Sequence, residues 1–138
     1  MKILLQTVQD LHSQQILHRN LKPENILIDY KPSGTHLTIT NFNFSCTLNP
    51  SDLSSWYVTR NLCSKCGTPG YMAPEILSEK QSTPASDVFS MGAILYACLT
   101  GEALFKGTDS GDIINKNCQV IFDKGSDKWL NLSDNGTT

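Results

Sequence analysis

The feature that most constrains this chain is a set of four short motifs that follow one another in a fixed order. His-Arg-Asn-Leu-Lys-Pro-Glu-Asn occupies residues 18–25, and Thr-Asn-Phe-Asn occupies residues 40–43. Gly-Thr-Pro-Gly-Tyr-Met-Ala-Pro-Glu occupies residues 67–75, and Ser-Asp-Val-Phe-Ser-Met-Gly occupies residues 86–92. The chance that all four occur together in this order is very small, so we interpret them as parts of one fold.

In order and spacing the motifs resemble the C-terminal lobe of the eukaryotic serine/threonine protein kinases, nearest the calcium/calmodulin-dependent type. The resemblance implies an α+β fold, a mainly α-helical kinase-like C-lobe with a short β-hairpin and with the N-lobe absent. The resemblance implies that residues 1–138 form one partial kinase domain. Within that domain it implies a catalytic loop at 18–25, a degenerate metal motif at 41–43, an activation segment at 44–75 and a central helix at 84–100.

The resemblance implies phosphoryl transfer from ATP, but the residues at two of the reacting positions are changed. In the family, one Asp accepts the proton of the substrate hydroxyl, while a second Asp and an Asn hold magnesium. This chain has Asn20 at the first Asp position and Asn41 at the second. An amide has nearly the shape of a carboxylate, but it is neutral and accepts no proton near neutral pH. Because a general base contributes about 100- to 10,000-fold in rate, its loss predicts a very slow enzyme.

Three further residues complete the candidate site. The resemblance implies that Lys22 lies beside the transferring phosphate and that Thr68 hydrogen-bonds Lys22 and the catalytic position at Asn20. Asn25 and Asn41 are the candidate ligands for nucleotide and metal, but magnesium prefers carboxylate oxygens, so we expect weak binding. We therefore expect no cofactor for the chain as it stands, and ATP with Mg²⁺ if the family activity survives in a longer chain. Turn capping is the alternative role of the two substituted Asn residues.

The resemblance also implies contacts that hold the motifs together. Phe42 would pack under His18, whereas the alternative is an ordinary core aromatic at a strand end. Both interpretations predict that Phe42 is buried. Asp87 would bond the backbone of the catalytic loop, although a surface carboxylate favoured by the helix dipole is the alternative. Glu75 has no evident partner, because the Arg that pairs with it in the family has no counterpart here. Asn43 replaces a Gly, and Asn tolerates positive φ.

Hydrophobic periodicity predicts the first helix and a hairpin. A helix over roughly residues 2–14 would bury one stripe made of Leu4, Val8 and Leu11. Strands at 26–29 and 37–40 would be joined by a Pro- and Gly-containing turn at 31–34, in a hairpin that ends at Asn41.

The second half of the chain predicts two more helices. Thr83 as N-cap, Pro84 at the first position and Gly101 after the end predict a helix over residues 84–100. Its expected apolar face consists of Val88, Met91, Ile94, Leu95 and Leu99, with Cys98 as a small core residue. A short helix is expected over residues 109–117. A last packed stretch is expected at Phe122, Trp129 and Leu132.

Residues 44–66 read as a long polar loop, in which the candidate phosphorylation sites are Ser45, Thr47, Ser51, Ser54, Ser55, Thr59 and Ser64. A phosphate there would pair with Arg19, whose alternative partners are backbone oxygens. Cys63 and Cys66 form a Cys-x-x-Cys pair that would suit zinc or redox chemistry. We favour two incidental thiols, because no second Cys/His pair has zinc-finger spacing.

Composition limits the remaining classes of function. The chain has 138 residues, 39% of them hydrophobic, and a net charge of −2, which gives no basis for nucleic-acid binding. No apolar stretch is long enough for a signal peptide or a membrane span, so we expect no membrane partner and a cytoplasmic, intracellular protein. Five cysteines without regular spacing agree with a reducing compartment.

Three hypotheses about function remain. The first is an inactive pseudokinase whose partners are proteins that dock on the activation segment or the C-lobe helices, with a missing N-lobe as another candidate partner. The second is a serine/threonine kinase with weak residual activity. The third is a non-functional kinase gene fragment. Faces that pack on the N-lobe in the family would expose apolar side chains here, which predicts low stability.

Overall fold

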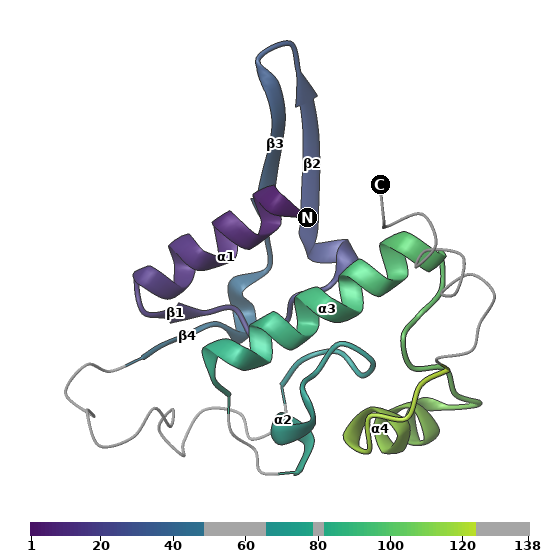
Figure 1. The fold of residues 1–138 in the computed structure, drawn as a ribbon. Coiled ribbons are helices and arrows are strands. Elements are labelled where there is room, and N and C mark those ends of the chain that lie inside the picture. The colour runs from purple at the N-terminus through teal and green to yellow at the C-terminus, as the bar shows by residue number, and fades with distance from the viewer. Residues whose placement is uncertain (49–65, 79–81, 124–138) are drawn as a thin grey trace, which may run out of the picture.

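The computed structural model describes residues 1–48, 66–78 and 82–123, and the description below concerns these residues. The helices are α1 Lys2–Ser13, α2 Pro74–Ser78, α3 Pro84–Thr100 and α4 Ser110–Cys118. The strands are β1 Ile16–Leu17, β2 Ile26–Lys31, β3 Gly34–Ile39 and β4 Cys46–Thr47, and the 3₁₀ turns are η1 Pro23–Asn25 and η2 Phe42–Phe44. In Figure 1, α3 runs through the middle, with α1 and the hairpin on one side and α2 and α4 on the other.

Helix α1 packs its predicted stripe into the main core. Leu4 and Val8 are buried and Leu11 is partly buried, which confirms the prediction of the helix and of its inner face. The core cluster joins α1 to the segment after β1, to β3 and to α3; its buried members are Leu4, Val8, Leu21, Ile39, Met91 and Ile94. This core fixes residues 18–25 between α1 and α3.

The predicted hairpin is present but is longer than the sequence indicated. Strands β2 and β3 pair antiparallel from Ile26 with Ile39 to Lys31 with Gly34, so only residues 32 and 33 form the turn. Gly34 has a φ of +129°, which suits glycine and lets the strand begin directly after the turn. Figure 1 shows the hairpin projecting away from the helices.

A second antiparallel pair was not predicted. Strands β1 and β4 contain two residues each, with Leu17 opposite Cys46, and β4 lies within the stretch interpreted as loop. Two residues are too few to show an alternating pattern, so periodicity could not reveal this pair.

Helix α3 begins and ends as predicted, but its exposure differs from the prediction. Gly101 follows the helix with a φ of +71°, and the Thr83 N–H donates to the Ser86 Oγ at 3.1 Å. Met91 and Ile94 are buried, whereas the other three residues of the expected apolar face, Val88, Leu95 and Leu99, are exposed, as is Cys98. The prediction was wrong for these four because the buried side of the helix is a different one: it carries small and polar side chains, Ser86, Asp87, Ser90 and Ala93, beside Met91, Ile94 and Tyr96.

The predicted short helix is α4, which begins after Asp109. The Asp109 Oδ1 accepts from the Asp112 N–H at 2.9 Å and so caps the helix. Phe122 contacts the rings of Tyr96 and Phe105, whereas Trp129 and Leu132 lie outside the described residues. None of the described helices is both long and apolar enough to cross a membrane.

We expect low stability, because many large apolar side chains are exposed. On α1, β2 and η2 they are Met1, Ile3, Leu5, Leu27, Ile28, Tyr30, Phe42 and Phe44. Urea unfolding of the 138-residue chain, followed by circular dichroism, should give a free energy of unfolding below about 5 kcal/mol, the lower end for native domains. A cooperative transition with a clearly larger value would contradict this expectation.

Candidate active site

Asp87 at the start of α3 holds the backbone of the loop at residues 18–25. Its carboxylate is 1% exposed and accepts from the backbone N–H groups of His18 at 3.0 Å and Arg19 at 2.9 Å. The Nε2 of His12, on α1, lies 2.9 Å from the same carboxylate. The prediction that Asp87 bonds the loop backbone is therefore confirmed, and its alternative role as a surface carboxylate is wrong.

The structure brings residues 18–25 and residues 40–43 together. The Nε2 of His18 lies 3.0 Å from the Thr40 carbonyl oxygen, and the Thr40 N–H donates to the Asn25 carbonyl oxygen at 2.9 Å. The Phe42 ring meets the His18 ring edge to face, with centroids 4.9 Å apart, as predicted. However, Phe42 is 42% exposed, so the prediction of its burial was wrong; the described elements cover only part of the ring.

Asn20 lies at the centre of the site and is 5% exposed. Its Oδ1 accepts from the Thr68 hydroxyl at 3.0 Å, and its main-chain oxygen accepts from the Asn25 Nδ2 at 2.8 Å. Lys22 is half-buried, and within the described parts of the chain it makes no hydrogen bond or ion pair. Thr68 therefore bonds Asn20 as expected, while its expected hydrogen bond to Lys22 is not formed.

The two candidate metal ligands hydrogen-bond to each other. Asn41 adopts a left-handed conformation with a φ of +64°, and its Nδ2 donates to the Asn25 Oδ1 at 3.3 Å. An ionised carboxylate at position 41 could not donate this bond. Among the described residues, no three His, Cys, Asp or Glu side chains converge as a metal site. A pair of neutral amides therefore does not fit magnesium, which prefers charged oxygen ligands.

Residues 67–75 are held by two helices. The Ser90 hydroxyl on α3 donates to the Tyr71 carbonyl oxygen at 2.7 Å. Asn117 on α4 is 0% exposed, and its side chain accepts from the Gly70 N–H at 2.9 Å and donates to the Met72 carbonyl oxygen at 2.8 Å. Sequence reasoning missed Asn117, although its position four residues after Ile113 places it on the inner face of the helix.

Tyr71 in this segment keeps its proton to unusually high pH. Burial raises the pKa of its phenol above the ordinary value, and the charges of Glu24 and Cys98 raise it further. The phenol is therefore neutral at physiological pH and adds no charge beside the site.

Glu75 has a partner, contrary to the sequence-based expectation. The Ser86 hydroxyl on α3 donates to its Oε1 at 2.7 Å. Ser86 also belongs to the capped start of α3, so the carboxylate ties α2 to that helix end. The expectation considered only the Arg used by the family and overlooked a hydroxyl that folding brings close.

Arg19 is buried, and its guanidinium donates to the Cys66 Sγ. Of the candidate phosphorylation sites, only Ser45 and Thr47 lie within the described residues, and the Ser45 hydroxyl donates to the Phe42 carbonyl oxygen at 2.7 Å. The pairing of Arg19 with a phosphate stays a prediction. Cys63 lies outside the described residues, so the Cys-x-x-Cys pair is untested, while Cys46, Cys98 and Cys118 form no disulfide.

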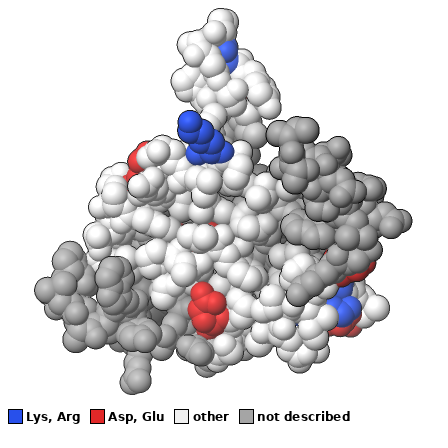
Figure 2. All heavy atoms as spheres, in the orientation of Figure 1, with Lys and Arg blue, Asp and Glu red and all other residues white. Residues whose placement is uncertain are grey.

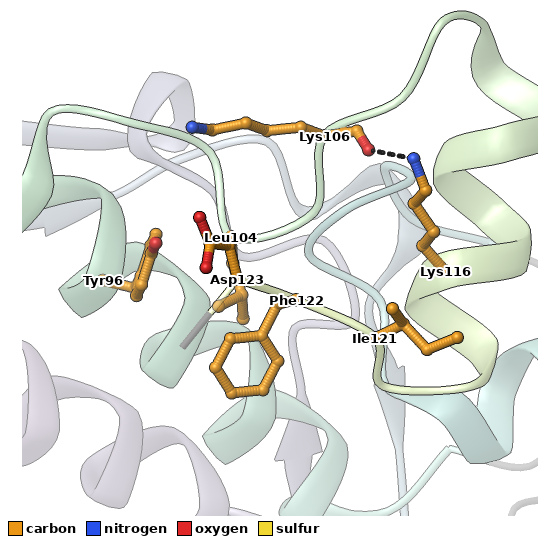
Figure 3. A pocket seen from close by; sticks show the side chains of 7 residues that line it. All are labelled: Tyr96, Leu104, Lys106, Lys116, Ile121, Phe122 and Asp123. Carbon is orange, nitrogen blue, oxygen red and sulfur yellow. Dashed lines mark hydrogen bonds between the residues drawn. The ribbon is translucent and has the colours of Figure 1, made fainter. Parts of the chain in front are cut away.

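A separate pocket of about 240 Å³ lies between α3 and α4 (Figure 3). It is lined by Tyr96, Leu104, Lys106, Lys116, Ile121, Phe122 and Asp123. The Lys116 ammonium donates to the Lys106 carbonyl oxygen at 2.9 Å and to Asp112 at 2.8 Å. None of the predicted site residues lines this pocket.

Charged side chains are scattered over the face shown in Figure 2, where neither sign gathers into an extended patch of described residues. Binding to nucleic acid commonly uses clustered Lys and Arg on one face. This face lacks that pattern.

Replacing Asn117 with alanine should lower the free energy of unfolding by about 2 kcal/mol, because the partly buried Gly70 N–H and the buried Met72 carbonyl lose their partners. Hydrogen exchange at the Gly70 amide should also speed up. Asn115→Ala is the matched control, since Asn115 is exposed on the same helix. Equal effects of the two changes in urea unfolding and exchange would show that Asn117 does not hold the segment.

Comparison with known proteins agrees with the geometry. A family model described as protein kinase domain matches residues 1–136. The chain is 32% identical over 134 residues to probable serine/threonine-protein kinase 2 of Plasmodium falciparum, covering 97% of this chain and 24% of that protein. It is 34% identical over 133 residues to calcium-dependent protein kinase 25 of Arabidopsis thaliana, covering 96% of this chain and 24% of that protein.

The chain is also 40% identical over 111 residues to the human phosphorylase b kinase gamma catalytic chain, liver/testis isoform, covering 76% of this chain and 25% of that protein. It thus spans about a quarter of the length of each of these relatives.

Proposed function

The chain belongs to the eukaryotic serine/threonine protein kinases, and we propose that it is a pseudokinase that has lost efficient phosphoryl transfer and acts by binding proteins. In this proposal, residues 18–25 are the former catalytic loop, residues 41–43 the former metal motif and residues 44–75 the activation segment. The whole is the C-lobe of a kinase domain around a central helix at 84–100. An N-lobe, if one is used, comes from outside these residues.

One observation carries the proposal: amides stand where the reaction needs two carboxylates. Asn20 accepts the Thr68 hydroxyl hydrogen with its only side-chain oxygen, so it has no basic group left for a substrate proton. Asn41 donates to Asn25, which occupies an oxygen that would otherwise face a cation. Loss of the base alone costs about 100- to 10,000-fold in rate.

Members of the family use ATP and Mg²⁺, and this chain would use the same cofactors if it were active. We propose that it does not use them productively. Adenine in the family lies between the two lobes, so weak nucleotide affinity is expected for these residues alone. The chemistry that magnesium supplies in the family is neutralisation of phosphate charge. Asn25 and Asn41 are poor ligands for that ion.

The proposed docking surface for partner proteins consists of residues 67–75 together with α4. Asn117 joins them, since it bonds the backbone at Gly70 and Met72 from its place on the helix. Ile114 is exposed on α4 and offers an apolar contact at this surface. A rigid segment beside an exposed apolar side chain suits a protein partner, because little order has to be imposed on binding.

Crosslinking capture from cells tests this surface. The Ile114→Asp variant should lose captured partners at least about tenfold, because a desolvated charge opposes docking. Tyr30→Asp is the control and should keep them, since Tyr30 is exposed and belongs to β2, in the hairpin that lies away from α4 in Figure 1. Equal capture by both variants would argue against docking at α4.

A weakly active serine/threonine kinase is the second candidate. The preserved scaffold favours it, since Asp87 still holds the loop and Lys22 is retained. Restoring the two carboxylates distinguishes the candidates, as described in the Discussion.

A further inference from the structure

We propose that the altered site binds a phosphate group without a metal ion, and that the group belongs to a phosphorylated serine or threonine of a partner protein. This inference rests on the proposed loss of catalysis and assigns a ligand to the same site. A phosphate monoester carries nearly two negative charges at neutral pH, so it needs positive charge and N–H or O–H donors.

The substitutions remove two formal negative charges from the site. Residues 18–25 contain Arg19, Lys22 and Glu24, residues 40–43 contain no charge, and the Asp87 carboxylate bonds the backbone of His18 and Arg19, so the sum is +2 − 2 = 0 with histidine neutral. With aspartate at both substituted positions, the same residues would sum to 0 − 2 = −2, and a phosphate would need a cation between it and the carboxylates. The two amides remove that requirement.

Asn20 provides a donor that the fold leaves unused. Its side-chain oxygen accepts from Thr68, so its planar amide turns the Nδ2 group away from that contact. Within the described residues Nδ2 makes no hydrogen bond, although Asn20 is only 5% exposed. Nδ2 is not among the fully enclosed polar atoms that lack a partner, so its surface is not completely covered. A buried amide with free hydrogens is costly unless an acceptor arrives.

Lys22 supplies the positive charge. Leu21 packs into the core, and Lys22 has an extended backbone with φ −162° and ψ 161°. Lys22 follows Asn20 by two residues and is itself half-buried, so its ammonium belongs to the same short loop as the Asn20 amide. The ammonium makes no ion pair with described residues, so no carboxylate of the described segments competes with an incoming anion.

A phosphorylated protein segment fits better than a free nucleotide. Thr68 links the site to residues 67–75, whose backbone is fixed by Ser90 and Asn117. A peptide lying on that segment would bring its phosphorylated side chain to Asn20. The phosphates of a nucleotide in this family are held through magnesium, for which Asn25 and Asn41 are unsuited.

Titration of the 138-residue chain, followed by calorimetry in the presence of a chelator, tests the proposal. The probes are a phosphoserine peptide, its unphosphorylated twin, inorganic phosphate and ATP. We expect the phosphoserine peptide to bind at least about tenfold more tightly than its twin, with no gain from added magnesium. Asn20→Asp should weaken phosphopeptide binding at least about tenfold, because it removes donors and adds a negative charge of nearly the same shape.

Lys22→Met should weaken binding of the phosphopeptide to a similar extent, whereas Lys31→Met at the tip of the hairpin should leave this binding unchanged. Lys31 is the matched control because it is exposed and paired with Asp29. Circular dichroism of each variant confirms that it is folded before titration.

Equal binding of the two peptides, or unchanged binding after Asn20→Asp, would overturn the inference. Inorganic phosphate that binds as tightly as the phosphopeptide would support the metal-free site and overturn the assignment to a protein segment. Tighter binding with magnesium would overturn the metal-free site. Partner capture through α4 is a separate readout, so failure here leaves the proposed docking function standing.

Discussion

The double change Asn20→Asp and Asn41→Asp should raise the rate of phosphate transfer by about 100- to 10,000-fold. The first change replaces an amide that cannot accept a proton, and the second replaces the amide that now donates to Asn25. The comparison needs an N-lobe, so it is made in a chimera that joins the N-lobe of calcium-dependent protein kinase 25 to this chain. Transfer from labelled ATP to a serine peptide is measured before and after the two changes.

Asn20→Asp alone or Asn41→Asp alone should raise the rate of phosphate transfer much less than the double change does, because proton transfer and metal binding act in the same step. Lys22→Met in the restored chimera is the control for kinase chemistry and should remove the gain. No gain from the pair would mean that the scaffold itself is no longer competent. A parent chimera that already transfers phosphate at the restored rate would contradict the proposed loss of catalysis.

Replacing Asp87 with alanine should lower the free energy of unfolding by about 3 to 5 kcal/mol, the usual cost of breaking a buried charged contact. The change leaves the N–H groups of His18 and Arg19 without their acceptor and removes the partner of His12. Because the chain is expected to be only marginally stable, this loss should unfold most of it at 25 °C. Circular dichroism over a urea series measures the effect.

Two further variants make the result interpretable. Asp87→Asn keeps the shape and one acceptor oxygen, so it should cost less, about 1 to 3 kcal/mol, and leave a measurable transition. Asp29→Ala on the hairpin removes an exposed carboxylate and should shift stability by no more than about 0.5 kcal/mol. If all three variants unfolded at the same urea concentration, Asp87 would not be the residue that holds the loop at residues 18–25.

The resemblance to the protein kinases predicted much of how the site comes together. It implied that Thr68 bonds the Asn20 position and that Asp87 bonds the backbone of the loop at residues 18–25, and the structure has both contacts. These are contacts between residues far apart in sequence. Periodicity alone would not have revealed them, because it reports only which side of one element is apolar.

The sequence was a poor guide to which apolar side chains are covered. Val88, Leu99 and Phe42 have the residue types of a core and are nevertheless exposed. An apolar pattern states that a side chain would gain from burial, but a neighbouring element has to supply the cover. On the expected apolar face of α3, the described elements cover only Met91 and Ile94. The exposed remainder of that face agrees with a surface available to other parts of a kinase fold or to a partner.

The contacts of Asn117 and Glu75 could not be predicted for a different reason. Each is one polar side chain that bonds a group brought near by tertiary structure, at Gly70 and at Ser86 respectively. Such pairs leave no repeated pattern in a single sequence. The two-residue pairing of β1 with β4 escaped prediction in the same way.

The most direct test of the proposed loss of catalysis is transfer of labelled phosphate from ATP by the protein as cells make it, captured intact and assayed with magnesium on a mixture of serine and threonine peptides. We predict no transfer above that of a sample in which Lys22 is replaced with methionine. Magnesium-dependent transfer that disappears with Lys22→Met would show that Asn20 and Asn41 still support catalysis and would contradict the proposal.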